Sequence, residues 1–282
     1  MANIISITSL KGGVGKTTTA INLAASFAVL EKKTLIIDCD PQGNVSSGLG
    51  INKDAISKDI TSVFTGEINI QEAVYNTCLD YLKCIPAKFN LYNIEKFIGK
   101  NRRNPGTILT DKIRALHTIY DYIIIDTPCA VNFLTTSALC ASGWALIPVT
   151  YYLYTIDILE ETLANIKKIK DSFNPSLNVA GLLLTMYDKR DYISEGFSDD
   201  IFADFNKLIL KTVINYDLKL HEALGSNKPV ALYDIMAKSA EAHLKLADEI
   251  EKIINKSKKK NTYKVIKPWE RGNAKIDRLP AK

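Results

Sequence analysis

The chain has 282 residues, a formal net charge of +5, and 46% hydrophobic against 24% charged side chains, which are ordinary proportions for a globular protein with a substantial core. No run approaches the roughly 18 consecutive apolar residues of a membrane span, and no basic segment with a cleavage site precedes the first apolar run, so neither a membrane protein nor a secreted one is expected. Five cysteines without a C-x-x-C spacing favour reduced thiols in a cytoplasmic protein over a disulfide framework or a metal cluster.

The positive charge is concentrated at the end of the chain. Residues 252–282 hold 11 Lys/Arg and two acids, a balance of +9, which leaves −4 for residues 1–251. The lysine run in this last part has no apolar periodicity. We therefore expect one domain over residues 1–255 and a basic, flexible tail over residues 256–282.

The first predicted strand, residues 4–7, leads into the sequence SLKGGVGKTT at residues 9–18, and a helix is predicted over residues 19–28. A strand, a glycine-rich turn and a helix N-terminus together suit a phosphate chain, because backbone N–H groups and the helix end attract its oxygens. Lys16 adds a full positive charge, and the Thr17 hydroxyl is suited to ligate Mg²⁺. The residues expected to cradle the phosphates are Gly12, Gly13, Val14, Gly15, Lys16, Thr17 and Thr18.

This loop departs from the usual G-x-x-x-x-G-K-[ST] pattern at its beginning. Leu10 stands in place of the first glycine, and a second lysine, Lys11, follows it. A second cation beside Lys16 is unfavourable unless it has its own anion, on the same nucleotide or on another one. The alternative interpretation is a solvated loop lysine.

The sequence KGGVGKTT resembles the deviant Walker A motif of the ParA/MinD family of P-loop ATPases. The resemblance implies that Lys11 reaches across an ATP-dependent homodimer to the nucleotide of the partner subunit, with Lys11 and Lys16 both acting in catalysis. Close approach of the two loops would then explain why Gly12 has no side chain. The resemblance extends over roughly residues 1–252 and implies ATP and Mg²⁺ as cofactors.

The second predicted strand, residues 34–38, ends in the sequence DCDPQGN at residues 38–44, which resembles the switch I motif of the same family. Asp40 is chemically suited to orient or partly deprotonate the water that attacks the γ-phosphate. Asp38 is assigned to the magnesium shell or to structural support. The alternative is a polar turn that merely follows a strand.

Beyond this point, β-branched apolar runs alternate with helical patterns, which is typical of βαβ units and predicts an α/β fold with a doubly wound, mostly parallel sheet flanked by helices. Strands are predicted at residues 81–86, 122–126, 144–149, 179–186 and 211–214. Helices are predicted at residues 60–65, 70–75, 91–99, 107–116, 133–141, 156–172, 191–206, 218–224 and 237–255, with an exposed break at 102–106.

A P-loop requires a second acid at the end of a neighbouring strand to hold the magnesium hydration shell. Asp126, the last residue of the predicted strand 122–126, is suited to this role, so Thr17, Asp126 and Asp38 are the expected metal residues. The family motif continues with two prolines after a variable residue, whereas this chain has Cys129 in place of the second one. The acid is retained, and only the shape of the following loop is in question.

After the last strand, chromosomal ParA proteins typically have Ile-Pro-Arg-Asn followed by another arginine, where this chain has INYDLK at residues 214–219. The proline and asparagine positions line the adenine in relatives, so Asn215 and Asp217 are candidates for contact with the base. The missing arginines are among those that hold non-specific DNA in relatives, which weakens that part of the resemblance.

We interpret the chain as a ParA-like ATPase, closest to the ParA/Soj-type partition proteins, whose dimer binds nucleoid DNA without sequence preference and positions a cargo with a ParB-like or other adaptor protein. DNA contact requires several cations on one face. Candidates in the body are Lys189, Arg190, Lys207, Lys211, Lys219, Lys238 and Lys245, and candidates in the tail are Lys256, Lys258, Lys259, Lys260, Lys264 and Lys267. For each of them a solvated surface lysine is the alternative, and the tail could equally solubilise the chain or dock a partner.

Two other functions compete with this interpretation. A MinD-like membrane-surface ATPase is disfavoured because Pro268 and Gly272 interrupt the tail, which presents no sustained apolar face. A metabolic or metallocluster ATPase of the same superfamily is disfavoured because only Cys129 lies near the site.

Overall fold

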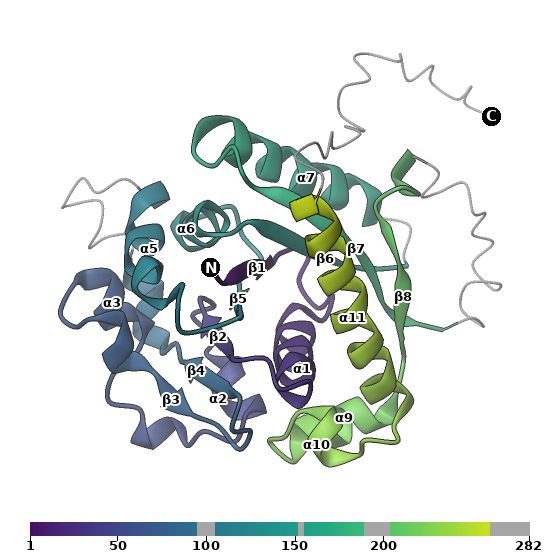
Figure 1. The fold of residues 1–282 in the computed structure, drawn as a ribbon, viewed down its shortest axis with the longest axis horizontal. Coiled ribbons are helices and arrows are strands. Elements are labelled where there is room, and N and C mark those ends of the chain that lie inside the picture. The colour runs from purple at the N-terminus through teal and green to yellow at the C-terminus, as the bar shows by residue number, and fades with distance from the viewer. Residues whose placement is uncertain (95–104, 152–154, 189–203, 260–282) are drawn as a thin grey trace, which may run out of the picture.

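The computed structural model describes residues 1–94, 105–151, 155–188 and 204–259 (Figure 1). Its strands are β1 (Asn3–Ile7), β2 (Thr34–Asp38), β3 (Tyr75–Asn76), β4 (Leu82–Ile85), β5 (Tyr122–Asp126), β6 (Trp144–Thr150), β7 (Asn178–Tyr187) and β8 (Ile209–Asn215). Its α-helices are α1 (Lys16–Val29), α2 (Asn44–Gly48), α3 (Ile60–Thr65), α5 (Pro105–Ile113), α6 (Phe133–Ala141), α7 (Thr155–Ser172), α9 (Leu218–Gly225), α10 (Val230–Tyr233) and α11 (Lys238–Lys259).

The described strands form one eight-stranded sheet in the order β3-β4-β2-β5-β1-β6-β7-β8. Every neighbouring pair is parallel except β3 with β4. This confirms the predicted doubly wound, mostly parallel sheet. Since β2, β5 and β1 are adjacent, the loops that follow their carboxyl ends lie at one edge of the sheet, where ligands of such folds bind.

Helices cover both faces of the sheet, as the alternation along β5 shows. Ile124 is buried in a cluster with residues of α1 and α11, whereas Ile123 and Ile125 are buried in a second cluster with residues of α3, α5 and α6. A third cluster joins α7 to β6 and β7. Strands buried on both faces read as continuous apolar runs, which is why the sequence YIIID already identified β5.

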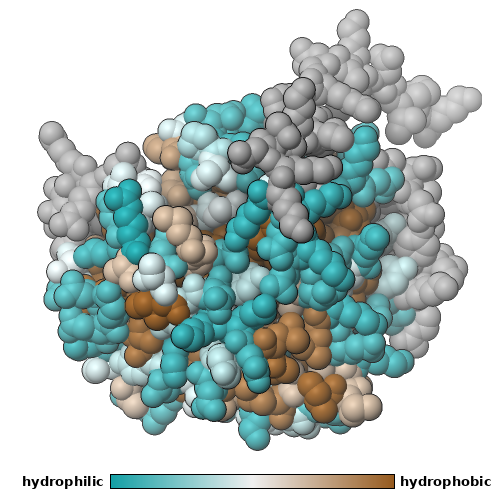
Figure 2. All heavy atoms as spheres, in the orientation of Figure 1, coloured by the Kyte–Doolittle hydropathy of each residue, from teal (hydrophilic) through white to brown (hydrophobic). Residues whose placement is uncertain are grey.

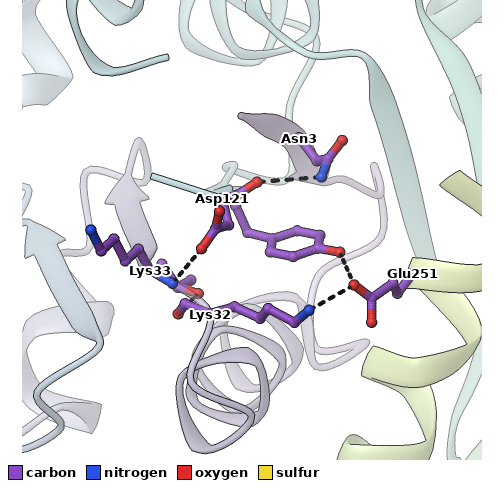
Figure 3. A network of polar contacts seen from close by, with 7 residues as sticks. Asn3, Lys32, Lys33, Asp121 and Glu251 are labelled. Atoms are coloured by element: carbon purple, nitrogen blue, oxygen red, sulfur yellow. Dashed lines mark hydrogen bonds and ion pairs between the residues drawn. The ribbon is translucent and has the colours of Figure 1, made fainter. Parts of the chain in front are cut away.

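Opposite the loop edge, polar contacts tie α1, β5 and α11 together (Figure 3). Glu251 of α11 accepts a 3.2 Å hydrogen bond from the Tyr122 hydroxyl and lies 3.1 Å from the Lys32 ammonium. The Tyr122 ring stacks on Phe27 of α1, with ring centroids 3.8 Å apart. Asp121 accepts the Lys33 N–H, which holds the α1–β2 connection against the start of β5.

Several predicted elements need correction. The helix expected at 70–75 is a 3₁₀ turn, Ile70–Ala73, and Tyr75 instead pairs with Cys84 in the antiparallel β3–β4 ladder. Residues 105 and 106 of the break expected at 102–106 belong to α5, and residues 102–104 lie outside the described part of the chain. The helix expected to end near residue 255 continues to Lys259.

Other predictions fall wholly or partly outside the described residues. Of the helix expected at 91–99, the structure has the 3₁₀ segment Phe89–Asn93, and most of the helix expected at 191–206 is not described. Lys189, Arg190 and the tail lysines from Lys260 onward also lie outside the description. None of the described helices is long and apolar enough to cross a membrane. All five cysteines are free thiols.

Candidate nucleotide site

The glycine-rich loop ends at Gly15, whose φ of 79° places it in the left-handed region directly before the first residue of α1. A side chain at this position would be strained, so the abrupt change from loop to helix requires glycine. The middle of the loop is fixed from the other side, because Thr185 of β7 donates a 3.0 Å hydrogen bond to the Val14 carbonyl. The N–H groups at the start of α1 are therefore presented from a braced loop, which suits anion binding.

Both lysines of the loop are held by groups of the same chain. The Lys16 ammonium, in a residue only 8% exposed, donates a 2.9 Å hydrogen bond to the Lys11 carbonyl. Burial lowers the pKa of Lys16, while nearby acidic groups, Asp126 and Asp40 among them, act in the opposite direction. A cation that has lost part of its hydration gains strongly from an anion, which is the electrostatic condition for phosphate binding.

Thr17 and Asp126 meet as predicted. The Thr17 hydroxyl donates a 2.7 Å hydrogen bond to Asp126 Oδ2, while Asp126 Oδ1 is buried without a hydrogen-bond partner. Burial raises the pKa of Asp126 to about 7. A hydroxyl and a carboxylate are the hard oxygen donors that Mg²⁺ prefers, and a divalent cation would supply the missing partner, so these residues fit a magnesium ion.

The described residues contain no group of three or more His, Cys, Asp or Glu side chains arranged to hold a metal. A magnesium ion at Thr17 and Asp126 would therefore complete its shell with water and phosphate oxygens, as Mg²⁺ commonly does beside a nucleotide.

Asp38 pairs directly with Asp126 across the β2–β5 ladder and is fully buried. Its Oδ1 accepts the Asp40 N–H at 2.9 Å, and its Oδ2 accepts the Val45 N–H at 3.1 Å. Burial and the neighbouring Asp126 raise the pKa of Asp38 well above its usual range. Of its two predicted roles, this geometry favours structural support of the loop over direct metal ligation.

Asp40 lies in the loop that Asp38 supports. It is partly exposed, and its Oδ1 accepts the Gln42 N–H at 2.9 Å. The turn closes at Gly43, whose φ is 62° and where an added Cβ would lie 2.7 Å from the Ala87 carbonyl oxygen. Asp40 is close enough to raise the pKa of Asp126 electrostatically, so the structure brings it to the phosphate end of the sheet.

The two candidates for base contact lie at the end of β8. Asn215 pairs with Tyr187 at the end of β7, and the preceding residue, Met186, reaches to within 3.7 Å of where a Cβ of Gly15 would be. Asn215 is thus on a segment adjacent to the loop. The Asp217 carboxylate has two hydrogen bonds within the fold, from the N–H groups of Lys219 and Ser239 at 3.0 Å each.

Sequence reasoning missed the hydroxyls that anchor the loop from outside. Thr162 of α7 accepts the Leu10 N–H at 3.2 Å, and Thr155 accepts a 3.0 Å hydrogen bond from the Lys11 ammonium. These two threonines are seven residues apart, so they share one face of the helix over two turns. The seven-residue spacing of the two threonines is visible in the sequence, but it does not tell which loop this face of α7 contacts.

A braced glycine-rich loop before a helix, with a lysine, a hydroxyl and an acid converging on it from adjacent parallel strands, characterises a P-loop nucleotide-binding protein. A family model described as an AAA domain matches residues 2–179, which is more than half of the chain.

Relatives of known type match over most of their length. The chain is 40% identical over 252 residues to the chromosome partitioning protein ParA of Myxococcus xanthus, with 89% of each chain covered. It is 36% identical over 251 residues to the sporulation initiation inhibitor protein Soj of Bacillus subtilis, covering 89% of this chain and 98% of Soj. The protein therefore belongs to the ParA/Soj family of P-loop NTPases.

Solved structures agree on the fold. The septum site-determining protein MinD of Pyrococcus horikoshii, complexed with Mg-ADP, superposes with a TM-score of 0.74 at 27% identity, covering 90% of this chain and 98% of MinD. An ATP complex of McdA from Cyanothece superposes with a TM-score of 0.77 at 21% identity, covering 89% of this chain and 96% of McdA. At 21% identity, the similarity to McdA concerns the fold alone.

Proposed function

We propose that this protein is a Mg²⁺-dependent ATPase that dimerises around ATP, binds DNA without sequence preference as a dimer, and positions a cargo with the help of an adaptor protein. The observation that carries the proposal is the presence of two lysines on one phosphate loop with their ammonium groups held at different places. The Lys16 ammonium is bonded to the main chain of the loop itself, and the Lys11 ammonium is bonded to Thr155 of α7. One loop thus carries a cation for its own nucleotide and a second one for a nucleotide on a partner.

The described residues divide the chemistry among them. Lys16 and the N–H groups at the start of α1 bind the phosphate oxygens, and Thr17 with Asp126 would hold the magnesium ion. When bound, Mg²⁺ offsets the negative charge that builds up on the phosphates. Asp40 orients the attacking water and accepts its proton, and Lys11 of the partner stabilises the charge that develops on the γ-phosphate.

A basic groove supports the DNA-binding part of the proposal. It has a volume of about 850 Å³ and lies between β8 and α11, where hydrophilic surface predominates along α11 (Figure 2). Its lysines are Lys211, Lys238, Lys245, Lys252 and Lys256.

Part of the acidic charge in this groove is already neutralised. Glu241 pairs with Lys245 at 2.6 Å and Asp248 pairs with Lys252 at 2.5 Å. Glu249 accepts only the main-chain N–H groups of Lys211 and Thr212 and keeps its charge. In the described part of the chain, Lys238 and Lys256 form no ion pair, so their charges remain available to phosphates. Of the other predicted DNA residues, Lys219 pairs with Glu222 at 2.8 Å on α9.

The proposal is tested by measuring the mass of the protein and its retention on random-sequence DNA with ATP, with ADP and without nucleotide. We expect a dimer and strong DNA retention with ATP alone, and the Lys11→Ala variant should remain monomeric. A chain truncated after Lys259 separates the body from the tail. Equal retention with ATP and ADP would contradict the proposed switch, because hydrolysis would then not release the protein.

A membrane-surface ATPase of the MinD type is the second candidate. It is favoured by exposed apolar residues around α9 and α10, where Figure 2 shows brown surface: Leu218 is 63%, Ile235 51% and Met236 87% exposed. Apolar side chains beside lysines can bind an anionic bilayer. Flotation with anionic vesicles in the presence of ATP decides between the two, since a DNA-positioning protein should stay in the aqueous fraction.

A further inference from the structure

The first limb of the phosphate loop lies against one face of α7. Thr155, in the described part of this helix, is only 2% exposed, and its hydroxyl accepts the hydrogen bond from the Lys11 ammonium at 3.0 Å. Two turns further on, Thr162 accepts the Leu10 N–H while donating to the Ile158 carbonyl at 2.7 Å. The main chain of Leu10 is thus bonded to Thr162, and the side chain of Lys11 is bonded to Thr155.

Lys11 takes part in the hydrogen bonds of both ammonium groups of the loop, its own and that of Lys16. Its carbonyl accepts the hydrogen bond from Lys16, while its own ammonium binds Thr155. Phosphate oxygens compete with that carbonyl for Lys16, because charge-assisted hydrogen bonds are stronger than those to neutral oxygens. Binding of a nucleotide therefore removes one of the contacts that fix the main chain of Lys11.

We infer that Thr155 is a positioning residue that holds the Lys11 ammonium in a resting orientation and so sets the ATP concentration at which two subunits associate. The inference rests on the proposed function, in which Lys11 binds the nucleotide of the partner. A neutral hydroxyl binds an ammonium more weakly than a phosphate does, so the contact stabilises the resting orientation of Lys11 without preventing its transfer to the phosphate. A buried hydroxyl at this place also keeps the lysine away from the phosphates of its own loop.

Three substitutions on α7 separate this role from a general effect on the helix. Thr155→Val keeps the side-chain shape and removes the acceptor for Lys11, whereas Thr155→Ser keeps the hydroxyl. Thr162→Val is the matched control, because it removes the acceptor for the Leu10 main chain and leaves the Lys11 contact in place. The unfolding temperatures of all three establish that they are folded.

The first measurement is the acylation rate of the Lys11 amine in nucleotide-free protein, followed by mass spectrometry. Loss of a hydrogen bond to a partly exposed charged group should raise this rate by about three- to tenfold in Thr155→Val. Thr155→Ser and Thr162→Val should stay within about twofold of wild type. An unchanged rate in Thr155→Val would overturn the inference, because Thr155 would then not hold the amine.

The second measurement is the ATP concentration at half-maximal dimerisation. We expect it to fall by about three- to tenfold in Thr155→Val and to be unaffected by Thr162→Val. The Lys11→Ala variant should remain monomeric, and adding Thr155→Val to it should not restore dimerisation. Faster acylation without this shift would also overturn the inference. If wild type itself fails to dimerise with ATP, the proposed function fails, and the acylation rates still decide whether Thr155 holds Lys11.

Discussion

The Thr17 hydroxyl and Asp126 Oδ2 lie 2.7 Å apart and join the first turn of α1 to the end of β5. This single contact connects the phosphate loop to the acid of the neighbouring strand, and it leaves Asp126 Oδ1 buried and unpaired. A buried carboxylate oxygen without a partner is unfavourable, so the pair is preorganised for a cation.

Removal of this hydroxyl should weaken nucleotide binding only when magnesium is present. Loss of a group that only orients a metal ligand already costs about 10- to 100-fold in affinity, so loss of the Thr17 hydroxyl itself in Thr17→Val should lower the affinity for Mg·ATP by at least that much, and Thr17→Ser should stay close to wild type. Titration with a fluorescent ATP analogue, once with Mg²⁺ and once with a chelator, measures the affinity in the presence and in the absence of magnesium. Equal affinities for the valine and serine variants would contradict the magnesium role of Thr17.

Asp40 should affect hydrolysis rather than binding. Since it is proposed to orient the water, Asp40→Ala should slow phosphate release by about 100-fold or more, with ATP affinity nearly unchanged. Asp54, whose side chain lies on an exposed 3₁₀ turn, provides the control Asp54→Ala. Single-turnover phosphate release and equilibrium binding separate the two effects. A variant that loses affinity and rate in equal measure would assign Asp40 to the binding of ATP instead.

The groove between β8 and α11 should carry part of the DNA affinity. Lys245→Glu replaces one cation of the groove by an anion and leaves Glu241 without its partner, so DNA binding should weaken. Its dependence on salt should also flatten, by about 0.9 in slope for each phosphate contact that is lost. Lys167→Glu on α7 is the matched control, because Lys167 pairs with Asp171 four residues away just as Lys245 pairs with Glu241. Fluorescence anisotropy across a range of salt concentrations gives both slopes. Equal losses in the two variants would place the DNA elsewhere.

His243 should make the fold sensitive to acid. It is 1% exposed, its Nδ1 donates to the Ser239 carbonyl, and burial lowers its pKa to about 4. The unfolded chain takes up the proton near pH 6.5, so stability is lost as the pH falls below that value, by about 2 kcal/mol between about pH 7.5 and about pH 5. Urea unfolding at several pH values measures this loss, and His243→Leu should abolish this part of it. A variant with the wild-type pH dependence would show that other groups cause it.

Much of the site could be predicted because its signals are local. The order strand, glycine-rich loop, lysine and threonine identified the phosphate loop, and an apolar run that ends in an acid identified Asp126. Each pattern lies within one short stretch of the chain and can be recognised there. The parallel register of β1 and β5, in which Ile7 pairs with Asp126, then brings the two stretches together.

What remained hidden depends on contacts between distant segments. Lys11 and Thr155 are 144 residues apart, and no local pattern tells which loop the threonine face of α7 contacts. The hydrogen bond from the Ser239 N–H to Asp217, 22 residues away, was equally invisible in the sequence, and the base contact of Asp217 stays a prediction. Tyr75 followed a helical pattern, yet the unsatisfied edge of β4 pairs with it as a strand.

The strand order has a consequence for how such proteins diverge. Lys16, Asp38 and Asp126 all follow from three adjacent strands in the middle of the sheet, whereas β8 and the lysine-lined groove beside it form one margin. Substitutions at that margin change the surface offered to other molecules without moving the central acids. Relatives can therefore diverge in their outer surface while the nucleotide-binding residues are inherited unchanged.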